Sequence, residues 1–271
     1  MKRAVLELAK VTMRFGGLVA IEDLSFDLEE GALMGLIGPN GAGKTTAFNV
    51  VTGVYAPSEG QLRLLGAELS GPKHQRALAG VARTFQNIRL FKELSVLDNV
   101  KIACHMRRGA GFWDAIVGTR RAREEERRQL DQAARLLEVL GLSGVHDAVA
   151  SSLPYGAQRR LEIARALATE PKVLLLDEPA AGMNHTETED LMRVIRKIRD
   201  DLKLSILLIE HDMKLVMEIC ENLLVLDHGV TIARGKPESI QRDPKVVEAY
   251  LGRAYAERLA AESADSSQGG P

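Results

Sequence analysis

The chain has 271 residues, 45% of them hydrophobic and 27% charged, and its formal net charge is −1. This length gives one large domain or two small ones, with enough apolar residues for a sizeable core. The near-zero charge provides no overall field that would draw the chain to nucleic acid or acidic lipid. No apolar run approaches the roughly 20 residues that cross a bilayer. Glu7 interrupts the short apolar stretch at the N-terminus, so no signal peptide is expected.

The two cysteines, Cys104 and Cys220, have neither metal-ligand nor CxxC spacing. Isolated cysteines of this kind are typical of buried thiols in a reducing compartment. We therefore predict a cytoplasmic protein, which would act at a membrane only by docking onto a partner there.

The first elements are two extended segments, predicted over residues 4–15 and 19–28, with Gly16-Gly17 as the turn between them. An apolar strand over 32–37 comes next, and a helical pattern over 46–52 follows it. The stretch between this strand and this helix is the most informative in the chain.

That stretch fits the pattern G-x-x-x-x-G-K-[ST]; it reads Gly38-Pro39-Asn40-Gly41-Ala42-Gly43-Lys44-Thr45-Thr46. Its glycines let the loop close around a phosphate chain, with backbone amides pointing at an anion beside a helix N-terminus. Lys44 is predicted to bridge the β- and γ-phosphates of ATP, and the Thr45 hydroxyl to bind Mg²⁺. The alternative is a chance Gly-rich turn, which the strand–loop–helix setting disfavours.

The middle of the chain changes character. A strand is predicted over 61–65, a helix over 72–78 and a short strand over 81–84 that leads to Gln86. From about residue 95 to residue 150 helical periodicity dominates, which predicts an inserted helical subdomain. Blocks of Arg and Glu alternate over 120–128; mixed signs without aromatics favour a solvated helix face over a nucleic-acid patch.

The remaining sequence alternates apolar runs with helical patterns, beginning with a helix from Pro154 to about residue 169. Strands are predicted over 173–177, 205–209, 223–227 and 230–234, and helices over 186–202, 212–220 and 246–251. Strands that alternate with helices form crossover units and a parallel sheet. From Ser263 onward the chain lacks core-forming residues, and we expect a disordered tail with no role in the fold.

Two acidic residues, Asp177 and Glu178, end the apolar strand predicted over 173–177. The carboxyl ends of parallel strands form the sheet edge at which ligands bind. Asp177 is placed to hold Mg²⁺, and Glu178 to orient and deprotonate an attacking water. A strand that ends in solvated acids is the alternative, which a phosphate loop in the same chain disfavours.

Three further residues are candidates on weaker grounds. Gln86 could reach Mg²⁺ or water with its amide, or it could be a surface glutamine. His211 follows the strand predicted over 205–209, where an imidazole could bond a γ-phosphate, although a lone histidine is more often structural. Phe15 could stack on adenine, or it could belong to the core.

At this point the chain resembles the nucleotide-binding subunit of ABC transporters over nearly its whole length. Residues 38–45 are similar to the Walker A motif of that family, Gln86 to its Q-loop and residues 173–178 to its Walker B, with Glu178 as the catalytic glutamate. Residues 180–184 match the D-loop, and His211 matches the switch histidine. Five motifs in the right order are specific, and the resemblance favours catalytic roles for Gln86 and His211.

The signature motif of the family, usually LSGGQ, corresponds to the stretch Leu153-Pro154-Tyr155-Gly156-Ala157-Gln158. The resemblance places Tyr155 and Gly156 against the nucleotide of the opposite subunit. Pro154 replaces a serine whose hydroxyl normally touches the γ-phosphate, and Ala157 stands at the usual glutamine. Backbone amides at the start of the following helix can still cap a phosphate. Asn184 stands where many relatives carry aspartate.

The resemblance implies an α/β fold: a P-loop NTPase cassette with a parallel-sheet core, an antiparallel β subdomain and an inserted α-helical subdomain. We expect residues 1–94 and 171–252 to form the ATP-binding core with the β subdomain. Residues 95–170 would form the helical subdomain, and residues 253–271 the tail.

Residues 153–167, 177–184, 243–244 and 249–252 are similar to the ATP-binding subunit of branched-chain amino acid importers. The longer helical insertion around residues 107–128 is similar to that of one of the two cassettes in those systems. This likeness implies a peripheral protein on the cytoplasmic face of the membrane, with ATP and Mg²⁺ as cofactors. Its expected partners are membrane permease subunits, a second cassette (a paralogue or a second copy) and, indirectly, a solute-binding protein, with no nucleic acid. Two alternatives stay open: a urea or amide importer cassette, and a soluble ATP-driven switch on ribosome or DNA.

Overall fold

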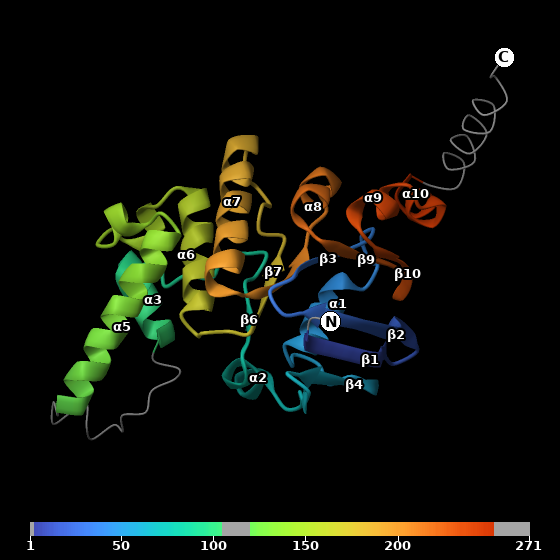
Figure 1. Ribbon diagram of the computed structural model, residues 1–271, viewed down its shortest axis with the longest axis horizontal. Helices are drawn as coiled ribbons and strands as arrows, with labels where there is room; N and C mark the ends of the chain where they lie inside the picture. The colour runs from blue at the N-terminus through green and yellow to red at the C-terminus, as the bar shows by residue number, and fades with distance from the viewer. Residues whose placement is uncertain (1–2, 105–119, 252–271) are drawn as a thin grey trace, which may run out of the picture.

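The computed structural model describes residues 3–104 and 120–251 (Figure 1). Two sheets make up the centre of this part of the chain, with helices around them. The predicted α/β class, with a parallel core, an antiparallel sheet and a helical insertion, is confirmed.

The core sheet has six strands in the order β10-β9-β3-β8-β7-β6. Their bounds are β3 Leu33–Ile37, β6 Val81–Arg83, β7 Val173–Asp177, β8 Ser205–Ile209, β9 Asn222–Asp227 and β10 Val230–Gly235. All pairs are parallel except β9 with β10. Every residue of β3, β7 and β8 is buried, as expected for apolar runs covered on both faces.

The second sheet is antiparallel, with the strand order β2-β1-β4-β5. Its bounds are β1 Ala4–Phe15, β2 Leu18–Glu29, β4 Glu59–Leu64 and β5 Ala67–Glu68. Helix α1 (Lys44–Val51) packs its buried face, including Phe48, into a core cluster shared with both sheets. Helix α1 therefore begins directly at the phosphate loop and is fixed from two sides.

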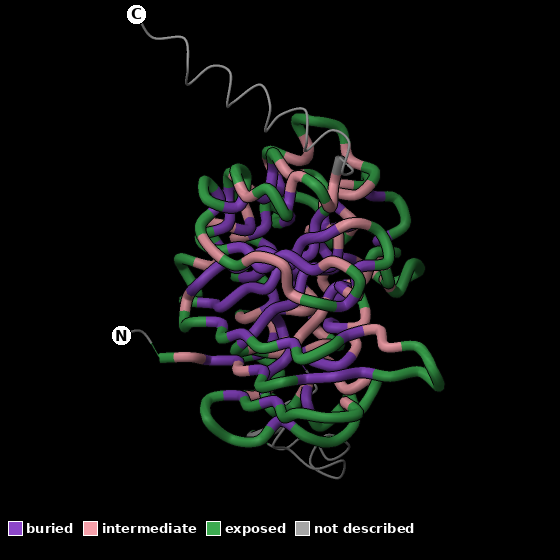
Figure 2. The backbone as a smooth tube through the Cα atoms, turned by 90° about the vertical axis from the view of Figure 1, so that its right-hand side faces the viewer, coloured by how far each residue is buried: buried purple, intermediate pink, exposed green. Residues whose placement is uncertain are grey.

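Helices α3 (Val96–Cys104), α5 (Arg120–Val139) and α6 (Tyr155–Leu167) pack together at one end of the molecule (Figure 1). The other helices are α2 Lys73–Ala79, α7 His185–Leu202, α8 Met213–Ile219, α9 Pro237–Gln241 and α10 Pro244–Leu251, with 3₁₀ turns at Ser143–Val145 and Ala150–Ser152. Buried and exposed residues are mixed along the strands of the antiparallel sheet, whereas β3, β7 and β8 are buried throughout; Figure 2 shows the buried backbone gathered in the interior of the molecule. The subdomain boundaries given above stay a prediction.

Local differences from the predicted elements are small. Strand β5 and helix α9 were not predicted, because two and five residues are too short for a periodic signal. The strand predicted over 61–65 ends at Leu64, since Leu65 has a φ of 54° and starts a turn with Gly66. Both cysteines are buried and free, as predicted. Within the described residues, no helix combines the length and the apolar character that a membrane span requires.

Helix α7 begins with a capping box. Asn184 Oδ1 accepts from the Glu187 backbone N–H at 2.9 Å, and Glu187 Oε2 accepts from the Asn184 N–H at 3.1 Å. Asn184→Ala is expected to lower the free energy of unfolding by about 1 kcal/mol, because one helix N–H loses its acceptor. Urea unfolding measures this, with the exposed Thr186→Ala as the control; equal stability of the two variants would contradict the cap.

Candidate active site

The phosphate loop has a backbone that only glycine tolerates at two positions. Gly38 has a φ of 150°, and a Cβ there would lie 2.1 Å from Leu226 O. Gly43 has a φ of 101°, and a Cβ there would lie 2.6 Å from Ala20 O. The loop is therefore packed tightly against strands from both sheets, which keeps its amides in a fixed curve.

Lys44 lies folded over this loop. Its Nζ donates to Gly38 O at 2.7 Å and to Pro39 O at 2.9 Å, and the residue is buried. Burial lowers the pKa of Lys44, while the nearby carboxylates of Glu178 and Asp177 act in the opposite direction. An ammonium has three N–H donors, so Lys44 can turn toward an anion held in the loop.

Asp177 lies at the end of β7, where it is buried against an arginine. Asp177 Oδ2 is 2.6 Å from Arg83 Nη2, and Arg83 Nη1 donates to Asn49 Oδ1 at 2.7 Å. The guanidinium carbon of Arg83 is 5.5 Å from the centre of the Phe48 ring and 5.4 Å from that of Phe85. The sequence predicted Asp177 but not this partner.

The three residues predicted to be catalytic meet at the edge of the sheet. Glu178 Oε2 accepts from Gln86 Nε2 at 2.8 Å and lies 4.0 Å from His211 Nδ1. Glu178 has a φ of 45°, a conformation uncommon outside glycine, and its N–H donates to Ile209 O at 2.9 Å. Strained residues of this kind cluster at active sites, and in this chain they also occur in turns, as at Leu65.

Glu210 joins the two loops that carry Glu178 and His211. Its side chain is buried, and its carboxylate accepts from Ala180 N at 2.9 Å and from His211 N at 3.3 Å. Burial raises the pKa of Glu210, and these two amides act in the opposite direction. Sequence reasoning missed Glu210; its only signal was an acid at the end of a fully apolar strand.

A buried ion pair on α6 holds the segment around Gln86. Arg159, which is fully buried, donates to Phe85 O at 2.6 Å, to Gln86 O at 2.7 Å and to Glu162 Oε2 at 2.8 Å. Glu162 Oε1 accepts from the backbone N–H groups of Phe85 and Arg89, each at 3.3 Å. Burial raises the pKa of Glu162, and Arg159 acts in the opposite direction. Helix α6 therefore fixes the backbone position of Gln86.

Tyr155 and Gly156 begin the same helix. Pro154 is its N-cap and supplies no side-chain hydrogen bond. The Tyr155 ring lies against Gly182, since a Cβ there would be 3.6 Å from the ring. Within the described part of the chain, no hydrogen bond joins Tyr155 or Gly156 to the phosphate loop. Tyr155 Oη instead accepts from Arg159 Nη2 at 3.4 Å. Among the described contacts, Phe15 likewise has none with the phosphate loop.

Phe15 is 39% exposed and meets Tyr55 edge to face, with ring centres 5.1 Å apart. The pair offers an aromatic surface that a base can stack on. Tyr55 was not singled out in the sequence, because it lies in a turn 40 residues away from Phe15.

The oxygen atoms near the phosphate loop suit a hard cation. Thr45, Asp177 and Gln86 offer hydroxyl, carboxylate and amide oxygens, the donor types that Mg²⁺ prefers. No group of three or more His, Cys, Asp or Glu side chains within the described ranges is arranged to hold a metal. The oxygens of Thr45, Asp177 and Gln86 therefore fit a Mg²⁺ ion that is also bound by the phosphate oxygens of a nucleotide.

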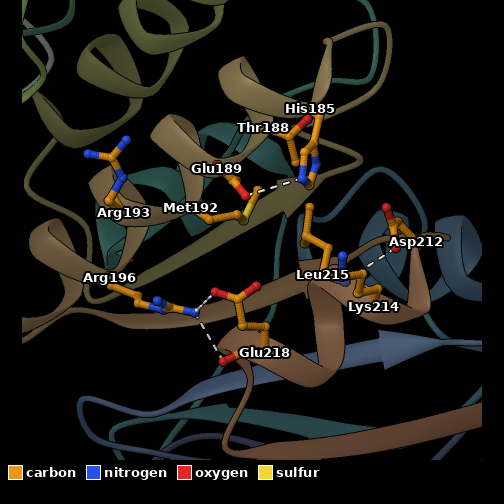
Figure 3. A pocket seen from close by; sticks show the side chains of 10 residues that line it. All are labelled: His185, Thr188, Glu189, Met192, Arg193, Arg196, Asp212, Lys214, Leu215 and Glu218. Carbon is orange, nitrogen blue, oxygen red and sulfur yellow. Dashed lines mark hydrogen bonds and ion pairs between the residues drawn. The ribbon is translucent and has the colours of Figure 1, made fainter.

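A separate cavity of about 380 Å³ lies between α7 and α8 (Figure 3). Two side-chain contacts lie in its lining: His185 Nε2 is 3.2 Å from Glu189 Oε1, and an ion pair joins Arg196 to Glu218 at 2.8 Å. Its lining contains none of the predicted site residues.

Comparison with known proteins identifies the family of the chain. A family model described as "ABC transporter" matches residues 21–181, and one described as "Branched-chain amino acid ATP-binding cassette transporter" matches residues 230–256. Fold and site define an ATP-binding cassette, and the chain belongs to the ABC transporter ATP-binding family.

Particular relatives narrow this further. The chain is 47% identical to the high-affinity branched-chain amino acid transport ATP-binding protein BraF of Pseudomonas aeruginosa, over 94% of this chain and all of the relative. It is 45% identical to the corresponding LivG protein of Escherichia coli K12 over the same shares. The crystal structure of the ADP conformation of MJ1267, an ATP-binding cassette of an ABC transporter, has a TM-score of 0.80 and 30% identity, covering 93% of this chain and all of that one.

Proposed function

We propose that this chain hydrolyses ATP to power uptake of branched-chain amino acids through a separate membrane permease, at the cytoplasmic face of the membrane. The observation that carries the proposal is the 47% identity to a branched-chain amino acid transport ATP-binding protein across its entire length. The match of residues 230–256 to a model described as a branched-chain amino acid ATP-binding cassette transporter supports it as well.

In this proposal the phosphate loop and Lys44 hold the phosphates of ATP. The carboxylate of Glu178 takes the proton of the attacking water, and the hydrogen bond from Gln86 and the nearby His211 imidazole orient these groups. Mg²⁺, held by Thr45 and Asp177 with Gln86 in reach, would neutralise charge on the phosphates.

A second cassette completes the site. Tyr155 and Gly156 make no hydrogen bond to the phosphate loop of their own chain, so their proposed contact with nucleotide requires an opposing subunit. The backbone amides of Tyr155 and Gly156, in the first turn of α6, are suited to a phosphate presented from outside. A post-hydrolysis dimer of another ATP-binding cassette, MJ0796, has the same fold at 22% identity.

The permease surface is proposed to be a groove of about 700 Å³ between α6, β6 and the segment after Gln86. Phe91, 44% exposed, and Ile102, 39% exposed, both line it. Arg165 lies over the Phe91 ring at 4.7 Å. The groove is mostly apolar and adjoins the backbone that Arg159 holds, so an inserted helix of the permease would contact the segment that carries Gln86.

Affinity capture of the permease from solubilised membranes tests the proposed partners and the proposed groove. Tagged Glu178→Gln protein with Mg-ATP is expected to retain a multi-span permease and a second cassette from detergent-solubilised native membranes, identified by mass spectrometry. Adding Phe91→Ser should lose the permease, because a large apolar contact is removed. Leu18→Ser, which removes another exposed apolar side chain, on β2, should keep it.

The alternatives give different results. Uptake of labelled leucine, isoleucine, valine and urea by cells with and without the chain names the solute. Ribosomal or DNA-bound partners with no permease would overturn the transport proposal in favour of an ATP-driven switch.

A further inference from the structure

The proposed metal ligand Asp177 already has a cation within the chain. Arg83 Nη2 lies 2.6 Å from Asp177 Oδ2, and the two side chains are only 9% and 8% exposed. A guanidinium stays charged at every accessible pH. The pair is therefore a permanent neutral unit as long as Arg83 stays in place.

Several contacts keep Arg83 in place. Its other terminal nitrogen donates to Asn49 Oδ1 at 2.7 Å, so the fork joins α1 to β7. The rings of Phe48 and Phe85 flank the guanidinium at 5.5 and 5.4 Å. These contacts hold a flexible side chain in one geometry, which a surface ion pair would not achieve.

This pairing changes what a free divalent cation finds at the site. Glu178, the acidic residue that follows Asp177, already accepts a hydrogen bond from Gln86 Nε2 at 2.8 Å. A lone Mg²⁺ or Mn²⁺ would meet the positive charge of Arg83 a few ångströms beyond the carboxylate. A metal–nucleotide complex brings phosphate oxygens of its own and depends less on Asp177.

We propose that Arg83 is a specificity-determining residue that makes divalent-metal binding at Asp177 conditional on nucleotide. The inference rests on the proposed role of Asp177 in ATP binding, and it is independent of the solute and of the permease. By linkage, the factor by which nucleotide strengthens metal binding equals the factor by which metal strengthens nucleotide binding. Arg83 raises that shared factor because it weakens the binding of metal in the absence of nucleotide.

The test is binding of Mn²⁺ to the full chain, measured by electron paramagnetic resonance with and without ATP. Arg83→Met is expected to bind free Mn²⁺ at least about tenfold more tightly than the natural chain, because a unit positive charge near the ion is removed. The gain should disappear in Arg83→Met/Asp177→Asn. Arg89→Met is the matched control, since Arg89 also stacks on Phe85, at 4.2 Å, and makes no bond to Asp177.

If Arg83→Met does not fold, Asn49→Ala takes its place. This variant keeps the Arg83–Asp177 ion pair and removes the hydrogen bond from Arg83 to Asn49. A smaller gain in free Mn²⁺ affinity is then expected. Unchanged free Mn²⁺ affinity in the folded variant, equal to that of Arg89→Met, overturns the proposal. Failure of Asp177→Asn to weaken Mg-ATP binding would instead contradict the proposed metal role of Asp177, so the two results are distinguishable.

Discussion

Replacing Glu178 by glutamine is expected to lower kcat for ATP hydrolysis by about 10²–10⁴-fold, the usual contribution of a positioned general base. The substitution keeps the shape of the side chain, and its amide oxygen can still accept the hydrogen bond that Gln86 Nε2 gives to Glu178. Nucleotide affinity should therefore persist while turnover stops. Steady-state phosphate release and retention of radiolabelled ATP on the purified cassette measure the two effects separately.

Glu29→Gln is the control for this prediction. Glu29 is an exposed acid at the end of β2, within the sheet that does not carry Glu178. Its variant should hydrolyse ATP at the natural rate. Rapid steady-state hydrolysis by Glu178→Gln would remove Glu178 from the proposed role and leave His211 and Gln86 as the residues to examine.

The second large effect concerns stability. Arg159→Met is expected to lower the free energy of unfolding by about 3–5 kcal/mol, because it leaves the buried carboxylate of Glu162 without its countercharge. It also leaves the carbonyls of Phe85 and Gln86 without the donors that lie at 2.6 and 2.7 Å. Chemical unfolding followed by circular dichroism gives the size of the loss.

Two further variants identify the cause. Arg160→Met, on the next residue of the same helix, removes an arginine that makes none of these bonds and should cost much less. Arg159→Met/Glu162→Leu should recover part of the loss, because replacing both partners of a buried pair is better tolerated than removing one. Equal stability of Arg159→Met and Arg160→Met would show that the Arg159–Glu162 pair does not hold the segment around Gln86.

Much of this architecture is predictable from local pattern. Uninterrupted apolar runs identify β3, β7 and β8, and the ends of parallel strands necessarily meet at one edge. That rule brings Asp177 and Glu178 together with the residues that follow β8, and His211 is the second of these. The glycine pattern around Lys44 identifies the phosphate loop in the same way.

The buried charges were not predictable. Arg83 pairs with Asp177, which lies 94 residues further along the chain, and Arg159 bonds carbonyls more than 70 residues earlier. Charged residues within a strand or a helix predict solvent exposure unless a partner is known, and the partner here comes from a distant segment. Sequence periodicity describes faces of single elements, so it carries no information on such pairs.

Lys44 also ties the phosphate loop to the helix that follows it. Its ammonium donates to Gly38 O and Pro39 O, so the side chain and the loop backbone close a small ring. An anion that enters the loop therefore meets an ammonium with two of its three N–H groups already bonded, and it takes the third directly or displaces a carbonyl. Lys44 then adds to nucleotide affinity only the difference between two satisfied arrangements, which is less than the full strength of a new ammonium–phosphate bond.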